Sequence, residues 1–159
     1  MPGSSNVVNV VVAGLGGQGV LKASGILADA AFRAGLDVKK SEIHGMSQRG
    51  GSVSSDVRFG ARVFSPMVPA GEADFLVVLA PSQVEVARPV LKSGGILIDP
   101  GLVDETRLAN KRSLNVALLG ALARHLDFAD NVWHAAIKAA LPEKLHAANL
   151  QAFAIGKTP

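Results

Sequence analysis

Residues 7–19 read VVNVVVAGLGGQG and carry the strongest structural signal in the chain. The run from Val7 to Ala13 is β-branched with one polar break at Asn9, which is typical of a strand buried on both faces. From Val20 to Ala34 apolar residues recur at helical spacing. Between these two segments the pattern G-x-G-x-x-G is formed by Gly14, Gly16 and Gly19. The sequence therefore predicts a strand, a glycine loop and a helix in direct succession.

A glycine loop in this position favours an anionic ligand. Glycines permit a tight turn and let backbone N–H groups approach a ligand, and the helix N-terminus adds a partial positive charge. A phosphate or pyrophosphate is the natural guest. The candidate cofactor-binding residues are Gly14, Gly16, Gly17, Gln18 and Gly19. The alternative is that the glycines only let helix and strand pack closely, with no ligand.

A dinucleotide site of this type also needs an acid at the end of the second strand, about 20 residues further on. Glu42 is the candidate, because Asp37 to Ile43 is predicted to be a short, partly exposed strand. The local sequence differs from the usual short acidic turn, since Ser41 precedes Glu42 and His44 follows shortly after. A solvated or ion-paired strand end is the competing interpretation.

The rest of the chain predicts an α/β fold. Alternation from Val53 to Phe59, followed by a turn, predicts a β-hairpin over Val53 to Ser65. Further strands are expected at Phe75 to Leu79 and Ile96 to Ile98, with a helix from Pro81 to about Leu91 that is kinked at Pro89 and ended by Gly94-Gly95. Three more helices are expected at Arg112 to Leu126, Asp130 to Leu141 and Pro142 to Phe153.

We therefore expect one domain over residues 1–159 with a largely aliphatic core. Its sheet should be Rossmann-like and mostly parallel, with helices on both faces, a β-hairpin insertion and a helical C-terminal tail. The strands near Val7, Phe75 and Ile96 should be the parallel ones.

A second loop, from His44 to Ser52, is polar and rich in glycine. It follows the carboxyl end of a predicted strand, where open α/β sheets bind their ligands. Arg49, followed by two glycines, can present its guanidinium to a carboxylate or phosphate without crowding. The residues expected to face an active-site cleft or a partner are His44, Gln48, Arg49, Gly50 and Gly51. The alternative is a hydrogen-bonded surface loop that fixes the hairpin.

Composition excludes several classes of function. The chain has no cysteine, so it can supply no disulfide, no cysteine nucleophile and no thiolate ligand for an iron–sulfur cluster. The net charge is +3, and the basic residues are scattered in pairs such as Lys39-Lys40 and Lys111-Arg112, which argues against nucleic-acid binding. No apolar run is long enough to span a bilayer, and residues 1–6 lack the features of a signal peptide, so we expect a cytoplasmic protein.

Metal binding is not expected either. The four histidines, His44, His125, His134 and His146, show no ligand spacing, and His146 is expected to be solvated. No Asp/Asn cluster of suitable spacing for Mg²⁺ is apparent.

Two motifs resemble the small subunit of indolepyruvate ferredoxin oxidoreductases and, more broadly, the gamma subunit or domain of 2-oxoacid:ferredoxin oxidoreductases. They are the glycine loop with its next residue, GLGGQGV at 14–20, and KSEIHGMSQRGGSV at 40–53. The resemblance continues through residues 57–60, 65–66, 71–74, 115–120 and 149–156. Between Gly101 and Ser113 this chain is shorter than expected for the family.

The resemblance implies a specific role. Such enzymes oxidatively decarboxylate a 2-oxoacid with thiamine diphosphate, transfer the acyl group to coenzyme A, and pass electrons through iron–sulfur clusters to ferredoxin. The large partner subunit is expected to hold the thiamine diphosphate, Mg²⁺ and clusters, so this chain alone would hold no cofactor. A contact between its glycine loop and a coenzyme A phosphate is expected. A stand-alone NAD(P)-binding oxidoreductase and a nucleotide-sensing module remain the alternatives.

Overall fold

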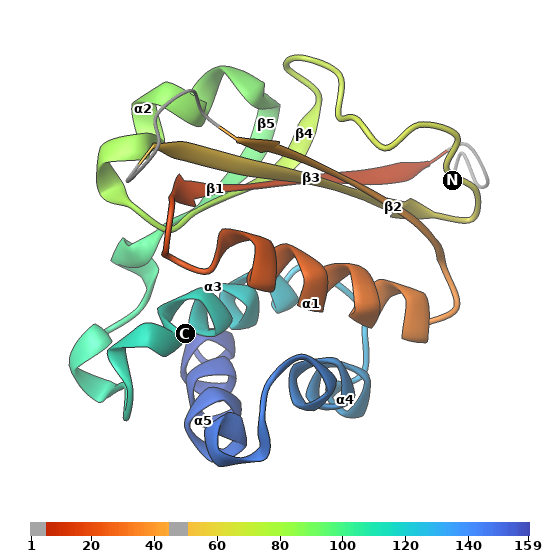
Figure 1. The fold of residues 1–159 in the computed structure, drawn as a ribbon. Helices are drawn as coiled ribbons and strands as arrows, with labels where there is room; N and C mark the ends of the chain where they lie inside the picture. The colour runs from red at the N-terminus through yellow and green to blue at the C-terminus, as the bar shows by residue number, and fades with distance from the viewer. Residues whose placement is uncertain (1–5, 45–50) are drawn as a thin grey trace.

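The computed structural model of the chain describes residues 6–44 and 51–159, and its centre is an open sheet of five strands (Figure 1). The strands lie in the order β2-β3-β1-β4-β5. Their bounds are Val7–Leu15 for β1, Asp37–His44 for β2, Ser52–Gly60 for β3, Ala73–Val78 for β4 and Leu91–Ile98 for β5. Strands β1, β4 and β5 are parallel, as expected, whereas β3 is antiparallel to both β1 and β2. The sheet is therefore mixed, with two parallel and two antiparallel pairings.

The predicted hairpin over Val53 to Ser65 is wrong in its second arm. The hairpin is formed by β2 and β3, in register from Asp37 opposite Gly60 to His44 opposite Val53. Because β3 has β2 on one edge and β1 on the other, no edge of β3 is free to pair with residues 62–65. The Asp37 carboxylate instead accepts a hydrogen bond from the Val63 amide at 2.7 Å, which holds this segment outside the sheet.

The helices lie on both faces of the sheet, but unequally (Figure 1). Their bounds are Val20–Arg33 for α1, Val84–Ala87 for α2, Leu114–Ala123 for α3, Asp130–Ala140 for α4 and His146–Lys157 for α5. Helices α1, α3, α4 and α5 lie on one face, and α2 lies on the other. Short 3₁₀ helices occur at Pro81–Gln83, Arg88–Val90, Pro100–Leu102, Glu105–Arg107, Lys111–Ser113 and Glu143–Leu145.

The helix expected from Pro81 to about Leu91 is much shorter than predicted. It consists of the single α-turn of α2 between two 3₁₀ helices, the second of which contains Pro89. Proline has no amide to donate to a helical hydrogen bond, so the α-helix does not extend through it. Strand β5 begins already at Leu91, and the two glycines expected to end the helix lie within that strand.

The main core fills the space between the sheet and the larger helical layer. It is mostly aliphatic, as predicted, but its largest fully buried side chains are Trp133, Phe59 and Phe153. The Trp133 ring lies 5.3 Å from that of Phe153, so α4 and α5 share an aromatic contact. A second, smaller core lies under α2 on the opposite face.

Helices α3 and α5 cross at very short range. A β-carbon built on Gly156 would lie 1.7 Å from the Ala117 carbonyl oxygen, and one on Gly120 would lie 2.1 Å from that of Phe153. The two backbones therefore touch where each helix carries a glycine. Within residues 6–44 and 51–159, no helix has the length and apolarity needed to cross a membrane.

Candidate functional site

The glycine loop joins β1 to α1 by a turn that its own residues close. Gly14 lies inside β1, and the turn proper begins at Gly16. Gly17 and Gly19 have φ angles of +87° and +83°, a conformation that disfavours any side chain. The Gln18 side-chain oxygen accepts a hydrogen bond from the Leu15 amide at 2.7 Å. Gln18 thus stabilises the turn, and the loop enters α1 through Gly19, which makes no side-chain cap.

Two of the loop amides are occupied within the protein. The Gly16 amide donates to the Gly51 carbonyl at 3.0 Å, and the Gln18 amide donates to the Leu15 carbonyl at 3.2 Å. In the described part of the chain, the amides of Gly17 and Gly19 have no acceptor. The same holds for the first-turn amides of α1, up to Ala23, whose amide donates to Gly19. An anion at this loop would therefore be met by those amides.

Gly17 and Gly19 line a cleft of about 450 Å³, and the first turn of α1 lines a hollow of about 270 Å³ that shares both glycines with it. The lining residues of the cleft are Gly17, Gln18, Gly19, Leu79, Lys111, Arg112, Leu114 and Asn115. Lys111 and Arg112 are exposed, and neither forms an ion pair with any acid in the described ranges. Helix α3 begins at Leu114, so two helix N-termini and two unpaired cations meet at one cleft. Each of these features favours an anion.

Asn115 connects the two sides of this cleft. It is 7% exposed, and its side-chain amide donates to the Gly19 carbonyl at 3.2 Å. A β-carbon on Gly19 would lie 2.5 Å from that nitrogen. In the sequence, Lys111 and Arg112 are one of several scattered basic pairs, and no pattern predicts a site role for Asn115. Lys111 and Arg112 lie within one turn before a buried helix, and Asn115 lies at its start. This position is the signal in the sequence that could identify them as site residues.

The second loop is only partly described. Gln48, Arg49 and Gly50 lie outside the described residues, so the cleft-facing role expected of them stays a prediction. The backbone of His44 ends β2 opposite Val53. Gly51 brings the end of this segment to the glycine loop by accepting the bond from Gly16. The segment thus connects the two strands of the hairpin, and its last residue adjoins the candidate site.

Glu42 is not placed as a dinucleotide site requires. It forms an ion pair with Lys40, with 2.7 Å between nitrogen and oxygen, as the competing interpretation expected. Strand β2 is at the sheet edge, and β3 lies between it and β1. Two strand spacings amount to roughly 10 Å, whereas the dinucleotide fold places its second strand directly beside the first. The structure therefore gives no support to a ribose contact by Glu42.

His146 contacts backbone carbonyl groups at the end of a helix. The His146 ring nitrogen lies 2.8 Å from the Leu141 carbonyl oxygen and 3.0 Å from that of Lys138. His146 therefore binds the C-terminal end of α4 and is half-buried, so the expectation that it is solvated is wrong. No group of three metal-ligating side chains occurs within the residues described.

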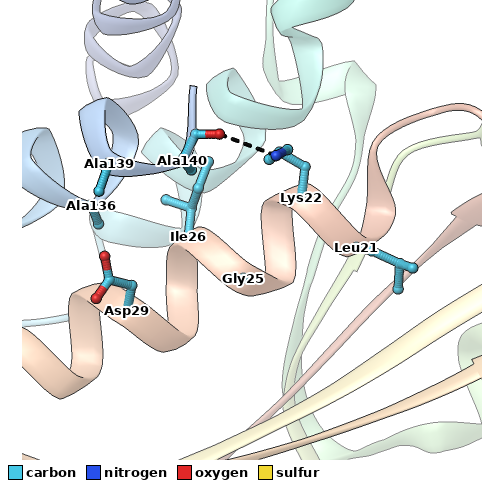
Figure 2. Close-up of a pocket in the computed structure, with 8 residues that line it drawn as sticks. All are labelled: Leu21, Lys22, Gly25, Ile26, Asp29, Ala136, Ala139 and Ala140. Atoms are coloured by element: carbon cyan, nitrogen blue, oxygen red, sulfur yellow. Dashed lines mark hydrogen bonds between the residues drawn. The ribbon is translucent and has the colours of Figure 1, made fainter. Parts of the chain in front are cut away.

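A groove between α1 and α4, of about 370 Å³, lacks comparable chemistry (Figure 2). Figure 2 shows Lys22 reaching across it to the carbonyl oxygen of Ala140, at 3.1 Å. Asp29 lies at the other end and is paired with Arg33. The remaining lining is mostly small and apolar, so the only charged side chains of the groove are already partnered. We assign it to helix packing.

The fold and the cleft together define an α/β domain with a glycine loop and an electropositive cleft at the N-terminus of its first long helix. The model of the pyruvate ferredoxin/flavodoxin oxidoreductase family matches residues 9–103, which include this loop, strands β2 to β5 and all of β1 except its first two residues. The chain belongs to that family, and its relatives place it among the small, gamma-type subunits.

Relatives with established names agree. Over 190 aligned positions the chain is 35% identical to indolepyruvate oxidoreductase subunit IorB of Pyrococcus horikoshii, and the alignment covers 93% of both chains. It is 50% identical over 91 residues to IorB of Thermococcus kodakarensis, covering 56% of this chain and 44% of that subunit. The first alignment is longer than the 159 residues of this chain, so the relative carries residues without a counterpart here.

Solved structures share the fold. The gamma subunit of a keto/oxoacid ferredoxin oxidoreductase from Geobacter sulfurreducens matches with a TM-score of 0.80 and 22% identity, covering 95% of this chain and 94% of that one. A 2-oxoglutarate:ferredoxin oxidoreductase from Magnetococcus marinus matches with a TM-score of 0.78 and 21% identity, covering 95% of this chain but 30% of that one. The same fold thus occurs both as a separate subunit and as part of a longer chain.

Proposed function

We propose that this chain is the cluster-free subunit of a thiamine diphosphate-dependent 2-oxoacid:ferredoxin oxidoreductase that acts on indolepyruvate or another arylpyruvate. With a large partner subunit it would convert the 2-oxoacid and coenzyme A to acyl-CoA and CO₂, with ferredoxin as electron acceptor. Thiamine diphosphate, Mg²⁺ and the iron–sulfur clusters belong to the partner in this proposal. The isolated chain is inactive, and residues 1–159 act as one gamma-type domain in the cytoplasm.

The assignment to indolepyruvate is supported by IorB relatives, of which one aligns along 93% of both chains. A ketoisovalerate oxidoreductase subunit from Methanothermobacter marburgensis is also similar, at 38% identity over 120 residues. The total absence of cysteine supports the division of labour, because a cluster held by thiolates must take them from another chain.

The observation that carries the ligand assignment is the cleft at the glycine loop. Coenzyme A presents a diphosphate and a 3′-phosphate, and both need positive partners. Lys111 and Arg112 face the unoccupied amides of Gly17 and Gly19 across this cleft. We propose that a coenzyme A phosphate lies between them, where hydrogen bonds and charge act together.

The test uses the enzyme reconstituted with its large subunit. Replacing both Lys111 and Arg112 by alanine should raise the KM for coenzyme A about tenfold, since two charge-assisted contacts are lost. The kcat at saturating coenzyme A and the melting temperature should change little, because both side chains are exposed. Lys144→Ala removes an exposed lysine from the 3₁₀ helix before α5 and serves as the control. An unchanged KM in the double variant would overturn the assignment of coenzyme A to this cleft.

A further inference from the structure

We infer that Asn115 is a positioning residue for the anion cleft: it holds the peptide group between Gly19 and Val20 so that the amide of Val20 points at the ligand. The inference rests on the proposed function, because it assumes that a phosphate occupies the cleft. Asn115 follows Gly19, the loop residue that it contacts, by 96 positions in the sequence.

Both polar atoms of the Asn115 side-chain amide form a hydrogen bond. Its nitrogen donates to the Gly19 carbonyl at 3.2 Å, and its oxygen accepts from the Val116 amide at 2.9 Å. The second bond ties the same side chain to the backbone of the next residue in α3. The side chain therefore joins the N-terminus of α3 to the residue that precedes α1.

The carbonyl that Asn115 holds belongs to a planar peptide group. Its other end is the N–H of Val20, and the two ends of a trans peptide point in opposite directions. The Gly19 carbonyl points along α1, where it also accepts from the Ala23 amide at 2.9 Å. The Val20 N–H must then point the opposite way, out of the start of α1, where Val20 lines a hollow of about 270 Å³ that shares Gly17 and Gly19 with the cleft. Fixing the carbonyl fixes the direction of a donor that the proposed ligand would use.

Space filling alone does not explain why this buried position carries an asparagine. Asn115 is 7% exposed, and a buried amide is costly unless its groups are bonded. Leucine would fill similar space without that cost, and the next two positions of α3, Val116 and Ala117, are apolar and buried. What leucine cannot supply is the donor to Gly19. Gly19 in turn is approached so closely by the Asn115 nitrogen that no side chain fits there.

The test compares two buried asparagines in the reconstituted enzyme. Asn115→Leu removes the donor to Gly19, and Asn149→Leu removes a similar bond, from its side-chain amide to the Leu145 carbonyl at 2.9 Å. Asn149 is 6% exposed and does not line the cleft, so it is a matched control. Both variants should lower the melting temperature, but only Asn115→Leu should raise the KM for coenzyme A. We expect a rise of about fivefold, with kcat and the KM for the 2-oxoacid unchanged.

The outcomes separate the two ideas. If removal of Lys111 and Arg112 raises the KM for coenzyme A and Asn115→Leu does not, the positioning role is overturned while the proposed cleft stands. If neither change affects this KM, the proposed function of the cleft fails, and the positioning role fails with it. Should Asn115→Leu not fold, Asn115→Ser gives the same test, because its side chain is one bond shorter and loses the contact with Gly19.

Discussion

The amide of Gly16 donates a 3.0 Å hydrogen bond to the carbonyl of Gly51. This bond joins the glycine loop after β1 to the residue that precedes β3, along the edge where β1 pairs antiparallel with β3. The two motifs that carry the family resemblance are thus parts of one structure. We therefore expect a substitution that shifts one motif to shift the other motif as well.

Arg49 is predicted to act on the assembled enzyme. We expect Arg49→Ala to lower the activity or the assembly of the complex sharply, because truncating one partner of a desolvated ion pair costs several-fold more than losing an exposed one. The melting temperature of the isolated subunit should barely change. Thermal unfolding of the subunit and steady-state turnover of the complex would check this. Strong destabilisation of the subunit, with full activity per folded molecule, would make Arg49 structural.

The two positive-φ glycines of the loop should respond differently to alanine. Gly17→Ala should cost only about 1–2 kcal/mol of stability, because the left-handed backbone is strained but its β-carbon meets no atom within 4 Å. Gly19→Ala adds a 2.5 Å contact with the Asn115 nitrogen to the same strain, so it should cost more. Urea unfolding of both variants measures the difference. Equal free energies of unfolding would show that the Asn115 contact relaxes without cost.

The crossing of α3 and α5 should not tolerate a side chain at Gly156. A β-carbon there would lie 1.7 Å from the Ala117 carbonyl oxygen, so Gly156→Val should destabilise the fold by about 3 kcal/mol or more. Gly25, in the middle of α1, is the control, because its β-carbon would meet nothing within 4 Å. Gly25→Ala should raise stability by up to about 1 kcal/mol through helix propensity. The prediction fails if the valine variant unfolds at the wild-type denaturant midpoint.

Asp56 should make stability fall as pH rises. Burial raises the pKa of its carboxyl above the ordinary value of 3.8, although the hydrogen bond from the Val68 amide at 2.8 Å opposes this shift. Between the unfolded and the folded pKa the native state binds more protons, so stability decreases with pH across that window. Asn can accept the same bond without a charge. We expect Asp56→Asn to melt above the wild type at pH 7, with the advantage shrinking as pH falls toward 3.8. An advantage independent of pH would exclude titration as the cause.

The sequence predicts those elements whose signals are local. The β-branched run before the glycine loop and the apolar spacing after it locate β1 and α1 within two residues of their observed ends. The three C-terminal helices follow from the same periodicity. These segments fold as predicted because their apolar residues recur at the spacing of a buried strand or helix. In β1, Val10 and Val12 face the larger core and Val11 and Ala13 face the smaller one.

The errors come from non-local contacts. The partner strand of β3 depends on which edge is free, and β2 takes that edge although its Lys39 and Lys40 give it a weaker strand signal. The cleft depends on the return of the chain from β5 to α3, which brings Arg112 beside Gly17. No spacing within the sequence encodes that approach. From the sequence, Asn115 can likewise be recognised only as part of the segment at 115–120 that resembles the family.

In the function that we propose, this chain completes a coenzyme A-dependent oxidoreductase but cannot work alone. The most direct measurement is the reduction of ferredoxin by indolepyruvate and coenzyme A, with this chain, the large subunit of the same organism, or both. We predict turnover only when both are present, with no visible absorbance from clusters in this chain, since it has no cysteine. Turnover by this chain alone, or by the large subunit alone at the rate and KM for coenzyme A of the mixture, would contradict the account.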